Sequence, residues 1–257
     1  MNAFRTILVS FLFLVFSVPS VSAEDGSNDG MSSGEWEKYF EVYGWLPNIY
    51  ITTAQQDHVT LTLGDLLKNL DMLAMFDLGV RKDKWSFATD ILYMNLGKKI
   101  KGEREFLGQP VTGEIKLDMR AFISTVNAGY QIAGDDMHRL SVIGGLRYLY
   151  IRVPVEFERD GRINITRTIV SSGHTWDGVV GLEGKKTIND QWYMDYYGDL
   201  GTGDSDLTWQ AKVGFGYQFK KFTGTLGFRY LRWNFDDKSE LDDLRIIGPY
   251  VGAKWTW

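Results

Sequence analysis

The sequence has no cysteine, few prolines (5 in 257 residues) and no apolar run long enough to cross a bilayer as a helix. Without cysteine, disulfide bonds cannot hold a small secreted fold together, so burial and backbone pairing must do so. A membrane-spanning helix needs about 20 consecutive apolar residues, and the run from Ile7 to Val18 is shorter. These absences exclude a disulfide scaffold and a helical membrane protein.

An excess of basic charge is also missing. The chain has 28 Lys and Arg against 33 Asp and Glu, which gives a formal net charge of −5. A protein that binds nucleic acid concentrates basic residues in a patch or stripe. The charge balance therefore gives no support for a nucleic-acid partner.

The first 23 residues have the order of a cleavable secretory signal peptide. Arg5 supplies the positive start, Ile7 to Val18 form the apolar core, and Val21-Ser22-Ala23 provide small residues before a cleavage site. We therefore expect cleavage after Ala23. Residues 24–35 are polar and rich in Gly and Ser, which predicts a disordered leader, and residues 36–257 are expected to form a single domain.

From Trp36 onward, apolar and polar residues alternate with a period of two. In the clearest run, the odd positions from Leu207 to Phe219 are apolar, while the even positions carry Thr, Gln, Lys and Gly. A strand places alternate residues on opposite faces, and a helix cannot hold this pattern on one face. Ten such segments are present: 36–47, 73–81, 84–96, 112–131, and the runs that begin at Leu140, Trp176, Trp192, Leu207, Phe222 and Ile247.

The strand number has two open alternatives. Segment 112–131 could be split by a bulge or a register change, and residues 153–170 could extend a hairpin. Eight or twelve strands are therefore alternatives to ten.

The connections between these segments alternate in length. The long ones are 48–72, 97–111, 152–173 and 236–243, the short ones are Arg81–Lys84, 132–137, 185–190 and Lys220-Lys221, and the connection from Gly201 to Ser205 is intermediate. Long extracellular loops and short periplasmic turns are typical of outer-membrane barrels, and an even strand number puts both termini on the periplasmic side. We therefore predict an all-β fold, a closed antiparallel transmembrane β-barrel of about ten strands.

Two of the long connections carry local signals of their own. Leu66, Leu67 and Leu70 follow Gly64-Asp65 at helical spacing, which predicts one or two turns of helix in the first long loop. Asp160-Gly161 precedes the RINITR segment between alternating arms, which predicts a two-residue turn in a hairpin that projects beyond the membrane.

The polar side of the strands decides whether their apolar side faces a core or lipid. A water-exposed surface would be crowded with Lys and Glu, whereas here Gly, Thr, Ser, Gln and Tyr predominate, with sparse charges of both signs. This mixture suits an enclosed lumen, so residues such as Val213 and Leu226 are expected to face lipid. The charged residues expected to line the lumen are Asp90, Arg120, Arg147, Asp177, Glu183, Asp195, Asp199, Lys212, Arg229 and Lys254.

Aromatic residues lie mostly near the ends of the predicted strands. An amphipathic ring is favoured at the lipid headgroups, where its body is in hydrocarbon and its polar tip in water. The residues expected there are Trp192, Trp209, Tyr230, Trp255 and Trp257.

The second half of the chain resembles the small outer-membrane barrels of the OmpA/OmpW type. The resemblance rests on the segments Trp176-Asp177-Gly178-Val179-Val180-Gly181-Leu182, Gly214-Phe215-Gly216-Tyr217 and Leu226-Gly227-Phe228-Arg229-Tyr230-Leu231, and on the terminal Trp257. It implies a location in the bacterial outer membrane, contact with membrane lipid and lipopolysaccharide, and recognition of the terminal aromatic residue by the barrel assembly machinery. It implies architecture and says little about activity.

Few residues have the pattern of a catalytic or metal site. His174 lies three residues before Asp177, a spacing that tends to place the two side chains on opposite faces of a strand, and His58 and His138 have no evident partner. The acidic loops around 199–206 and 236–243 lack the residue order of a calcium-binding loop. We therefore expect no catalytic residues, no metal and no cofactor.

Three functions are compatible with this sequence. The first is a non-enzymatic outer-membrane barrel that is structural or forms a narrow channel for small solutes, because barrels of about eight strands fill with side chains and open channels need about 16 strands. The second is an enzyme at the barrel rim that modifies lipid A or cleaves peptides. The third is an adhesin or receptor that binds through loops 48–72 and 152–173.

Overall fold

The computed structural model describes residues 35–53, 58–106, 109–135, 137–159, 166–235 and 241–257. The described residues lie in one compact unit. The expected signal peptide, the leader up to residue 34, the turn at Asp160-Gly161 and the acidic residues 236–240 lie outside the described residues. No helix in the described ranges is long and apolar enough to cross a membrane.

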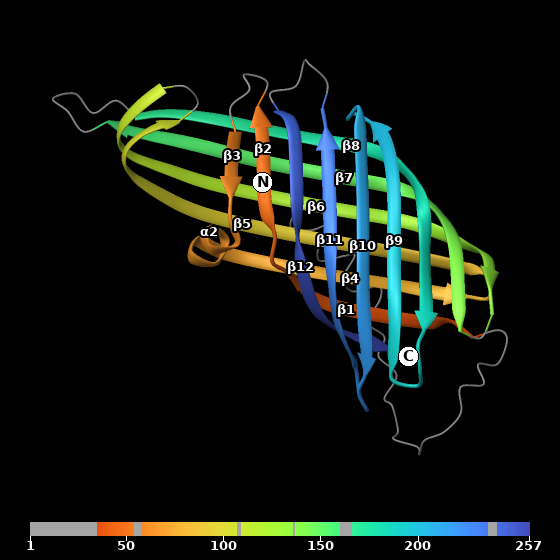
Figure 1. Ribbon diagram of the computed structural model, residues 1–257. Coiled ribbons are helices and arrows are strands. Elements are labelled where there is room, and N and C mark those ends of the chain that lie inside the picture. The colour runs from red at the N-terminus through yellow and green to blue at the C-terminus, as the bar shows by residue number, and fades with distance from the viewer. Residues whose placement is uncertain (1–34, 54–57, 107–108, 136, 160–165, 236–240) are drawn as a thin grey trace, which may run out of the picture. The chain divides into compact units, whose positions relative to one another are not determined.

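Ten strands of the described chain close into an antiparallel barrel (Figure 1). Neighbouring strands pair in chain order, and the last strand pairs with the first, from Tyr39 opposite Thr256 to Trp45 opposite Tyr250. The predicted closed antiparallel barrel of ten strands is confirmed. Its strands are β1 (Glu37–Trp45), β4 (Leu70–Lys82), β5 (Trp85–Phe106), β6 (Gln109–Gly134), β7 (His138–Arg159), β8 (Thr166–Thr187), β9 (Trp192–Gly203), β10 (Leu207–Gln218), β11 (Thr223–Asn234) and β12 (Leu241–Thr256).

Between β1 and β4 the chain adds two short strands and a helix. After a break at Leu46-Pro47, β2 (Asn48–Thr53) continues along β12, and β3 (His58–Leu61) pairs with β2. Proline has no N–H to give to a sheet, so it suits this break. The helix α2 (Leu63–Asn69) follows, which confirms the predicted one or two turns.

A reciprocal pair of hydrogen bonds begins helix α2. The backbone N–H of Asp65 donates to Thr62 Oγ1 over 3.3 Å, and the backbone N–H of Thr62 donates to Asp65 Oδ2 over 3.2 Å. Such a capping box satisfies backbone donors that the first helical turn leaves without a partner.

The short connections lie together at one end of the barrel, which we call the short-turn end. They include the two-residue turn Asp83-Lys84, where Asp83 has a φ of 52°, and the turn between β6 and β7. In that second turn, Asp135 accepts hydrogen bonds from the backbone N–H groups of Met137 and His138, which lower the pKa of its carboxyl group. Segment 112–131 is not split: β6 is continuous and shifts register against β7 between Gln131 and Ala133.

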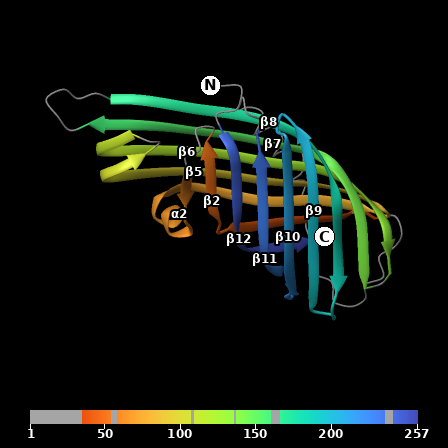
Figure 2. The same cartoon turned by 45° about the horizontal axis from the view of Figure 1, so that its top comes forward.

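At the opposite end, which we call the long-hairpin end, four strands extend past the others. Residues 97–111 were expected to form a loop, but β5 and β6 stay paired from Gly97 opposite Asp118 to Phe106 opposite Gln109. Similarly, β7 and β8 stay paired up to Glu158 opposite Thr166, which is the hairpin extension left open for 153–170. Cross-strand hydrogen bonds satisfy the backbone here, so charged residues do not prevent strand formation. Both hairpins extend beyond β2 and β3 in Figures 1 and 2.

The apolar side of the strands faces outward. Val213 is 44% exposed and Leu226 is 60% exposed, although both are large hydrophobic residues. On the neighbouring positions, Lys212 and Thr225 face the interior. At a rise of about 3.3 Å per residue, the outward face of β7 from Leu140 to Tyr150 would extend about 33 Å along the strand, or about 25 Å along the barrel axis at the tilt of about 40° that is typical of such barrels.

The predicted interface aromatics lie at the two edges of this outward band. At the short-turn end, Trp192 packs on Tyr217 with a centroid distance of 4.9 Å, and Trp255 packs on Phe222 at 6.3 Å. Trp257 lies beside them and pairs through its backbone with Lys38. At the other edge, Trp209 stacks on Tyr230 at 4.4 Å.

Candidate functional site: the filled barrel interior

Inward-facing residues of all ten strands meet in the barrel interior, where glycines opposite tyrosines make the space. A Cβ atom on Gly216 would lie 2.2 Å from the Tyr193 ring, and a Cβ atom on Gly214 would lie 2.2 Å from Tyr250 Oη. Small residues opposite large ones are how a narrow barrel accommodates its side chains. The alternation of Gly with polar residues thus allows rings and charges to cross the interior.

Arg147 on β7 is the centre of one polar cluster. It forms an ion pair with Asp199 on β9, and neither side chain has exposed surface. Its guanidinium group also donates to Thr125 Oγ1 over 3.2 Å and to Thr208 Oγ1 over 3.0 Å. The hydroxyl of Tyr197 donates to Asp199 Oδ2 over 2.6 Å. This cluster links β6, β7, β9 and β10 across the interior.

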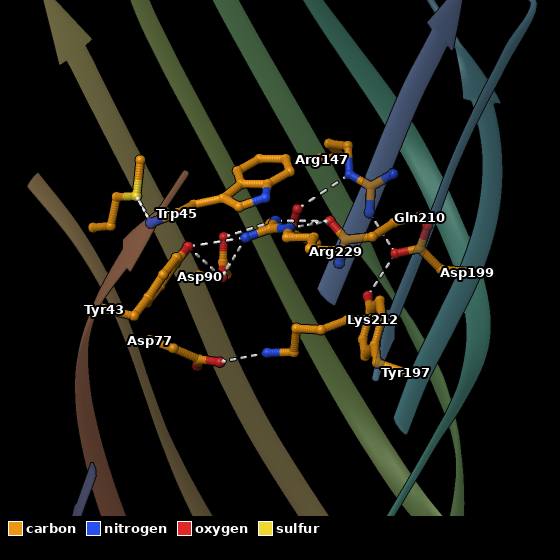
Figure 3. Close-up of polar contacts among 12 residues, drawn as sticks. Tyr43, Trp45, Asp77, Asp90, Arg147, Tyr197, Asp199, Gln210, Lys212 and Arg229 are labelled. Carbon is orange, nitrogen blue, oxygen red and sulfur yellow. Dashed lines mark hydrogen bonds and ion pairs between the residues drawn. The ribbon is translucent and has the colours of Figure 1, made fainter. Parts of the chain in front are cut away.

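Arg229 on β11 is the centre of a second cluster, shown in Figure 3. It forms an ion pair with Asp90 on β5 at 3.0 Å and donates to Gln210 Oε1 over 2.7 Å and to Tyr43 Oη over 2.9 Å. Its guanidinium carbon lies 4.8 Å from the centre of the Trp45 ring, a cation–π distance. Because β5 and β11 are not neighbours in the barrel, this cluster bridges opposite walls.

Further ion pairs fill the interior toward the short-turn end. Lys212 lies 3.7 Å from Asp77, and Lys254 lies 3.7 Å from Glu41, which accepts a hydrogen bond from Thr225. Glu183 interacts with Arg81 at 3.8 Å and accepts a hydrogen bond from Ser86 at 3.0 Å. Acids and bases thus alternate around the interior and compensate one another's charge.

Toward the long-hairpin end the interior is apolar, which corrects the expectation of a mixed polar lumen along the whole barrel. A buried cluster there includes Trp45, Met75, Met119, Leu149 and Leu244. The free space among its described side chains is about 20 Å³, close to the volume that one water molecule needs. A second tryptophan, Trp233, joins the two regions, because its indole N–H donates to Asp177 Oδ2 over 3.2 Å.

All but one of the charged residues that were predicted to line the lumen face the barrel interior. Those on the interior face are Asp90, Arg147, Asp177, Glu183, Asp195, Asp199, Lys212, Arg229 and Lys254. The expectation for Arg120 was wrong: the buried residues of β6 are Met119, Ala121 and Ile123, so Arg120 lies on the outward face and is exposed. At this level the barrel interior is apolar, so β6 carries hydrophobic residues on both faces. The alternation of polar and apolar residues that would have placed Arg120 on the outward face is therefore missing.

The sequence analysis missed several residues that complete the interior. Tyr43, Tyr197 and Gln210 bind the charged groups directly, and Trp45 covers Arg229. The sequence did indicate these positions, since each residue lies an even number of positions from a charged inward-facing residue on the same strand and therefore shares its face. The methionines that face the interior had no such indication in the sequence.

The candidate rim dyad is not formed. Asp177 is fully buried in the interior, where Ser205 donates to it, whereas His174 is exposed on the outward face of the same strand. His138 interacts with Tyr196 at 2.7 Å, and His58 with Thr52 at 3.2 Å. Among the described residues, no group of three or more His, Asp or Glu side chains could hold a metal ion.

A closed antiparallel barrel with an outward apolar band and aromatic edges is the architecture of a transmembrane barrel of the bacterial outer membrane. Closure leaves no free sheet edge in lipid, and the outward band matches the thickness of the hydrocarbon layer. The chain is therefore a small outer-membrane β-barrel.

Several solved structures of bacterial proteins have a similar course of the chain. The outer membrane protease OmpT of Escherichia coli has a TM-score of 0.46 at 10% identity, over 90% of this chain and 100% of that one. The translocator domain of the autotransporter NalP of Neisseria meningitidis has a TM-score of 0.48 at 12% identity, over 88% and 90%. The attachment invasion locus protein Ail of Yersinia pestis has 0.38 at 11%, over 86% and 98%.

No family model matches the sequence, and no curated protein matches it. The structural scores lie below 0.5 and the identities near one tenth, so they carry no argument about what this chain binds or does.

Proposed function

We propose that this protein is a closed, non-enzymatic outer-membrane barrel that anchors its long hairpins outside the cell and does not conduct solutes. The observation that carries the proposal is the filled interior: an ion-paired region and an apolar region follow one another along the barrel. Open aqueous channels are typical of barrels with about 16 strands. In this proposal the short-turn end is periplasmic and the long-hairpin end extracellular.

The proposed partners are outer-membrane lipid, lipopolysaccharide and the barrel assembly machinery, which would recognise the aromatic end of β12 at Trp257. Two further features agree with a passive barrel. His174 and Asp177 lie on opposite faces of β8, and the interior ion pairs cross the path that a solute would take.

Planar-bilayer recording tests the proposal. We expect the purified barrel to give no steady conductance steps, because the ion-paired and the apolar regions each obstruct the lumen. The variant Asp90→Ala/Arg229→Ala should stay silent too, since the apolar region still closes the barrel. A general porin in the same bilayer serves as the positive control. Reproducible steps from the unaltered protein would favour the narrow-channel function instead.

A second candidate function, attachment through the hairpins, is favoured by the strand extensions at the long-hairpin end. β5 and β6 continue for about ten residue pairs beyond Leu96, where the pairing of β5 with β4 ends. Gly102 lies opposite Gly113, so joining these two positions through a short turn removes the distal part of the hairpin. Loss of cell attachment by this truncated protein, with an unchanged amount of folded barrel, would support the second function.

A further inference from the structure

Inside the described part of the barrel, the inward charges of the first and the last strands are separated by sign. Glu37 and Arg81 are set apart, because they pair with each other at the short-turn end. The acidic set, on β1, β4 and β5, consists of Glu41, Asp77 and Asp90. The basic set, on β10, β11 and β12, consists of Lys212, Arg229 and Lys254. The two sets occupy six consecutive strands and meet at the seam where β12 pairs with β1.

Each set is unfavourable by itself. Glu41 lies directly opposite Asp77, and Asp77 lies directly opposite Asp90. Lys212 likewise lies directly opposite Arg229. Like charges that face each other across a strand pair destabilise the pairing of the strands. The strands of one set therefore need the charges of the other set nearby.

The ion pairs of these residues join the beginning of the barrel to its end. Lys254 lies opposite Glu41 in the register of the seam, and their charged groups are 3.7 Å apart. Asp77 and Lys212 point toward one another across the interior at 3.7 Å, as Figure 3 shows. The pair between β5 and β11, at the centre of the second polar cluster, has the same direction. Acids from the first barrel strands thus meet bases from the last ones.

The alternation of apolar and polar residues does not fix the register of this seam. If β1 moved by two residues along β12, every outward residue would still face lipid. Lys254 would then lie opposite Tyr39 or Tyr43 in place of Glu41, and the acids of β4 and β5 would move about 7 Å past the bases of β10 and β11. This shift would separate all three ion pairs and leave buried charges without compensation.

We propose that the acidic and basic sets select the register in which the last strand closes on the first. Attraction between the sets favours the native register, and the buried charges that a shift leaves without a partner disfavour any other. A buried ion pair adds little net stability, whereas fixing a register is a documented use of buried polar groups. The proposal concerns the assembly of the barrel and is independent of whether the barrel conducts.

Disulfide reporters can measure the register, because the chain has no cysteine of its own. Val42 and Ala253 are directly opposite each other at outward positions of the seam, so Val42→Cys/Ala253→Cys reports the native register. Val42→Cys/Val251→Cys and Gly44→Cys/Ala253→Cys report shifts by two residues in the two directions. Cα atoms directly opposite are about 4.5–5.5 Å apart, which suits a disulfide, whereas diagonal neighbours at about 7–8 Å are too distant.

The test variants reverse one charge at the seam and then restore the match. Lys254→Glu places a second acid opposite Glu41, and we expect it to lower the ratio of native to shifted cross-link by about tenfold. Glu41→Lys/Lys254→Glu exchanges the two charges and should return the ratio to that of the unaltered interior. The oxidised proteins are compared on a denaturing gel without reductant, where a cross-link between the two ends of the chain changes the migration.

The matched control removes a buried ion pair that lies away from the seam. Arg147→Met/Asp199→Leu takes the charges from β7 and β9 and should leave the cross-linking ratio unchanged. Heat-modifiable migration of each variant on a gel measures the fraction that is folded.

Three results would overturn the proposal: an unchanged ratio in Lys254→Glu, a lowered ratio that Glu41→Lys/Lys254→Glu does not restore, or a similar change in the control, which would indicate a general loss of stability. If Lys254→Glu gives no folded barrel, recovery of folding in Glu41→Lys/Lys254→Glu replaces the ratio as the supporting result. Absence of that recovery would then contradict the proposal.

Discussion

Arg147 and Asp199 form a fully buried ion pair. Removing one partner should therefore affect the stability of the barrel differently from removing both. Removing one charge of such a pair leaves the other buried without compensation, which costs about 3–5 kcal/mol, whereas replacing both with apolar groups is often close to neutral. Thr125, Thr208 and Tyr197 hold the pair in place through further hydrogen bonds.

We expect Arg147→Met to lower the free energy of unfolding by about 3–5 kcal/mol, and Arg147→Met/Asp199→Leu to recover most of that loss. Urea unfolding of the barrel in lipid vesicles, followed by tryptophan fluorescence, measures both. If the double variant were as unstable as the single one, the ion pair would stabilise the barrel more than two apolar side chains in its place. Lys220→Gln, in an exposed turn, is the control for a simple loss of charge.

The glycines are a second feature at the residue scale, because several lie where the strands leave no room for a side chain. A Cβ atom on Gly181 would lie 2.1 Å from the Gly198 carbonyl oxygen, and one on Gly145 would lie 2.1 Å from the Val126 carbonyl oxygen. Backbone atoms cannot move aside as a flexible side chain can. Glycine at these positions permits the close approach of β6, β7, β8 and β9.

At the scale of single elements, the clearest alternation gave the most accurate strands. The expected run 207–219 matches β10, and the expected turn at Lys220-Lys221 separates it from β11. Alternation was clear there because the interior partners are Thr, Gln, Lys and Gly, which contrast with the outward Trp, Val and Phe. On β6 the interior partners are Met119, Ala121 and Ile123, and the contrast is lost.

The extended hairpins are the element that the sequence described least well. Residues 97–111 look like a loop because lysines and glutamates interrupt the apolar pattern. The backbone pairing of β5 with β6 nevertheless continues to Phe106 opposite Gln109. Beyond the membrane both sides of a strand can face water, so a strand there needs no apolar face.

Removal of the distal β5–β6 hairpin should leave the barrel folded. The pairs that close the barrel at this level, from Lys82 opposite Trp85 to Leu70 opposite Leu96, all lie before the truncation point at Gly102 and Gly113. We expect the truncated protein to keep its heat-modifiable migration and a similar urea midpoint. A truncated barrel that no longer folds would show that the hairpin contributes to the stability of the whole fold.

At the scale of the whole molecule, stability depends on the pairing of the first strand with the last. β1 and β12 are about 200 residues apart in sequence, and Gly252 lies opposite Tyr43 in their register. A Cβ atom on Gly252 would lie 2.8 Å from Glu41 Oε1 and 2.9 Å from Tyr43 Cβ. On the same two strands, Gly44 faces outward and has no atom within 4 Å of such a Cβ position.

This difference gives a matched pair of variants for barrel closure. Gly252→Val should destabilise the barrel by about 1–3 kcal/mol through overpacking, whereas Gly44→Val should have little effect because it adds an apolar group toward lipid. The fraction of heat-modifiable protein after refolding into vesicles is the measurement. Equal behaviour of the two variants would contradict the assignment of the interior and outward faces.

The sequence by itself determined the period of the strands, because each strand carries a local alternation that survives without knowledge of its neighbours. The residue types on the polar side gave the direction of the apolar face, whereas the strand number was predicted as about ten with eight or twelve as alternatives. It also determined which end has short turns, and the helix in the first long loop. These properties depend on residues close together in the chain.

Only the tertiary structure decided which interior charges meet, that the long-hairpin half of the lumen is apolar, and that Arg120 faces outward. The register between strands sets these features, and it brings together residues such as Asp90 and Arg229 that are 139 positions apart. No local pattern encodes a register of that range, because shifting a strand by two residues keeps its alternation and changes all its partners.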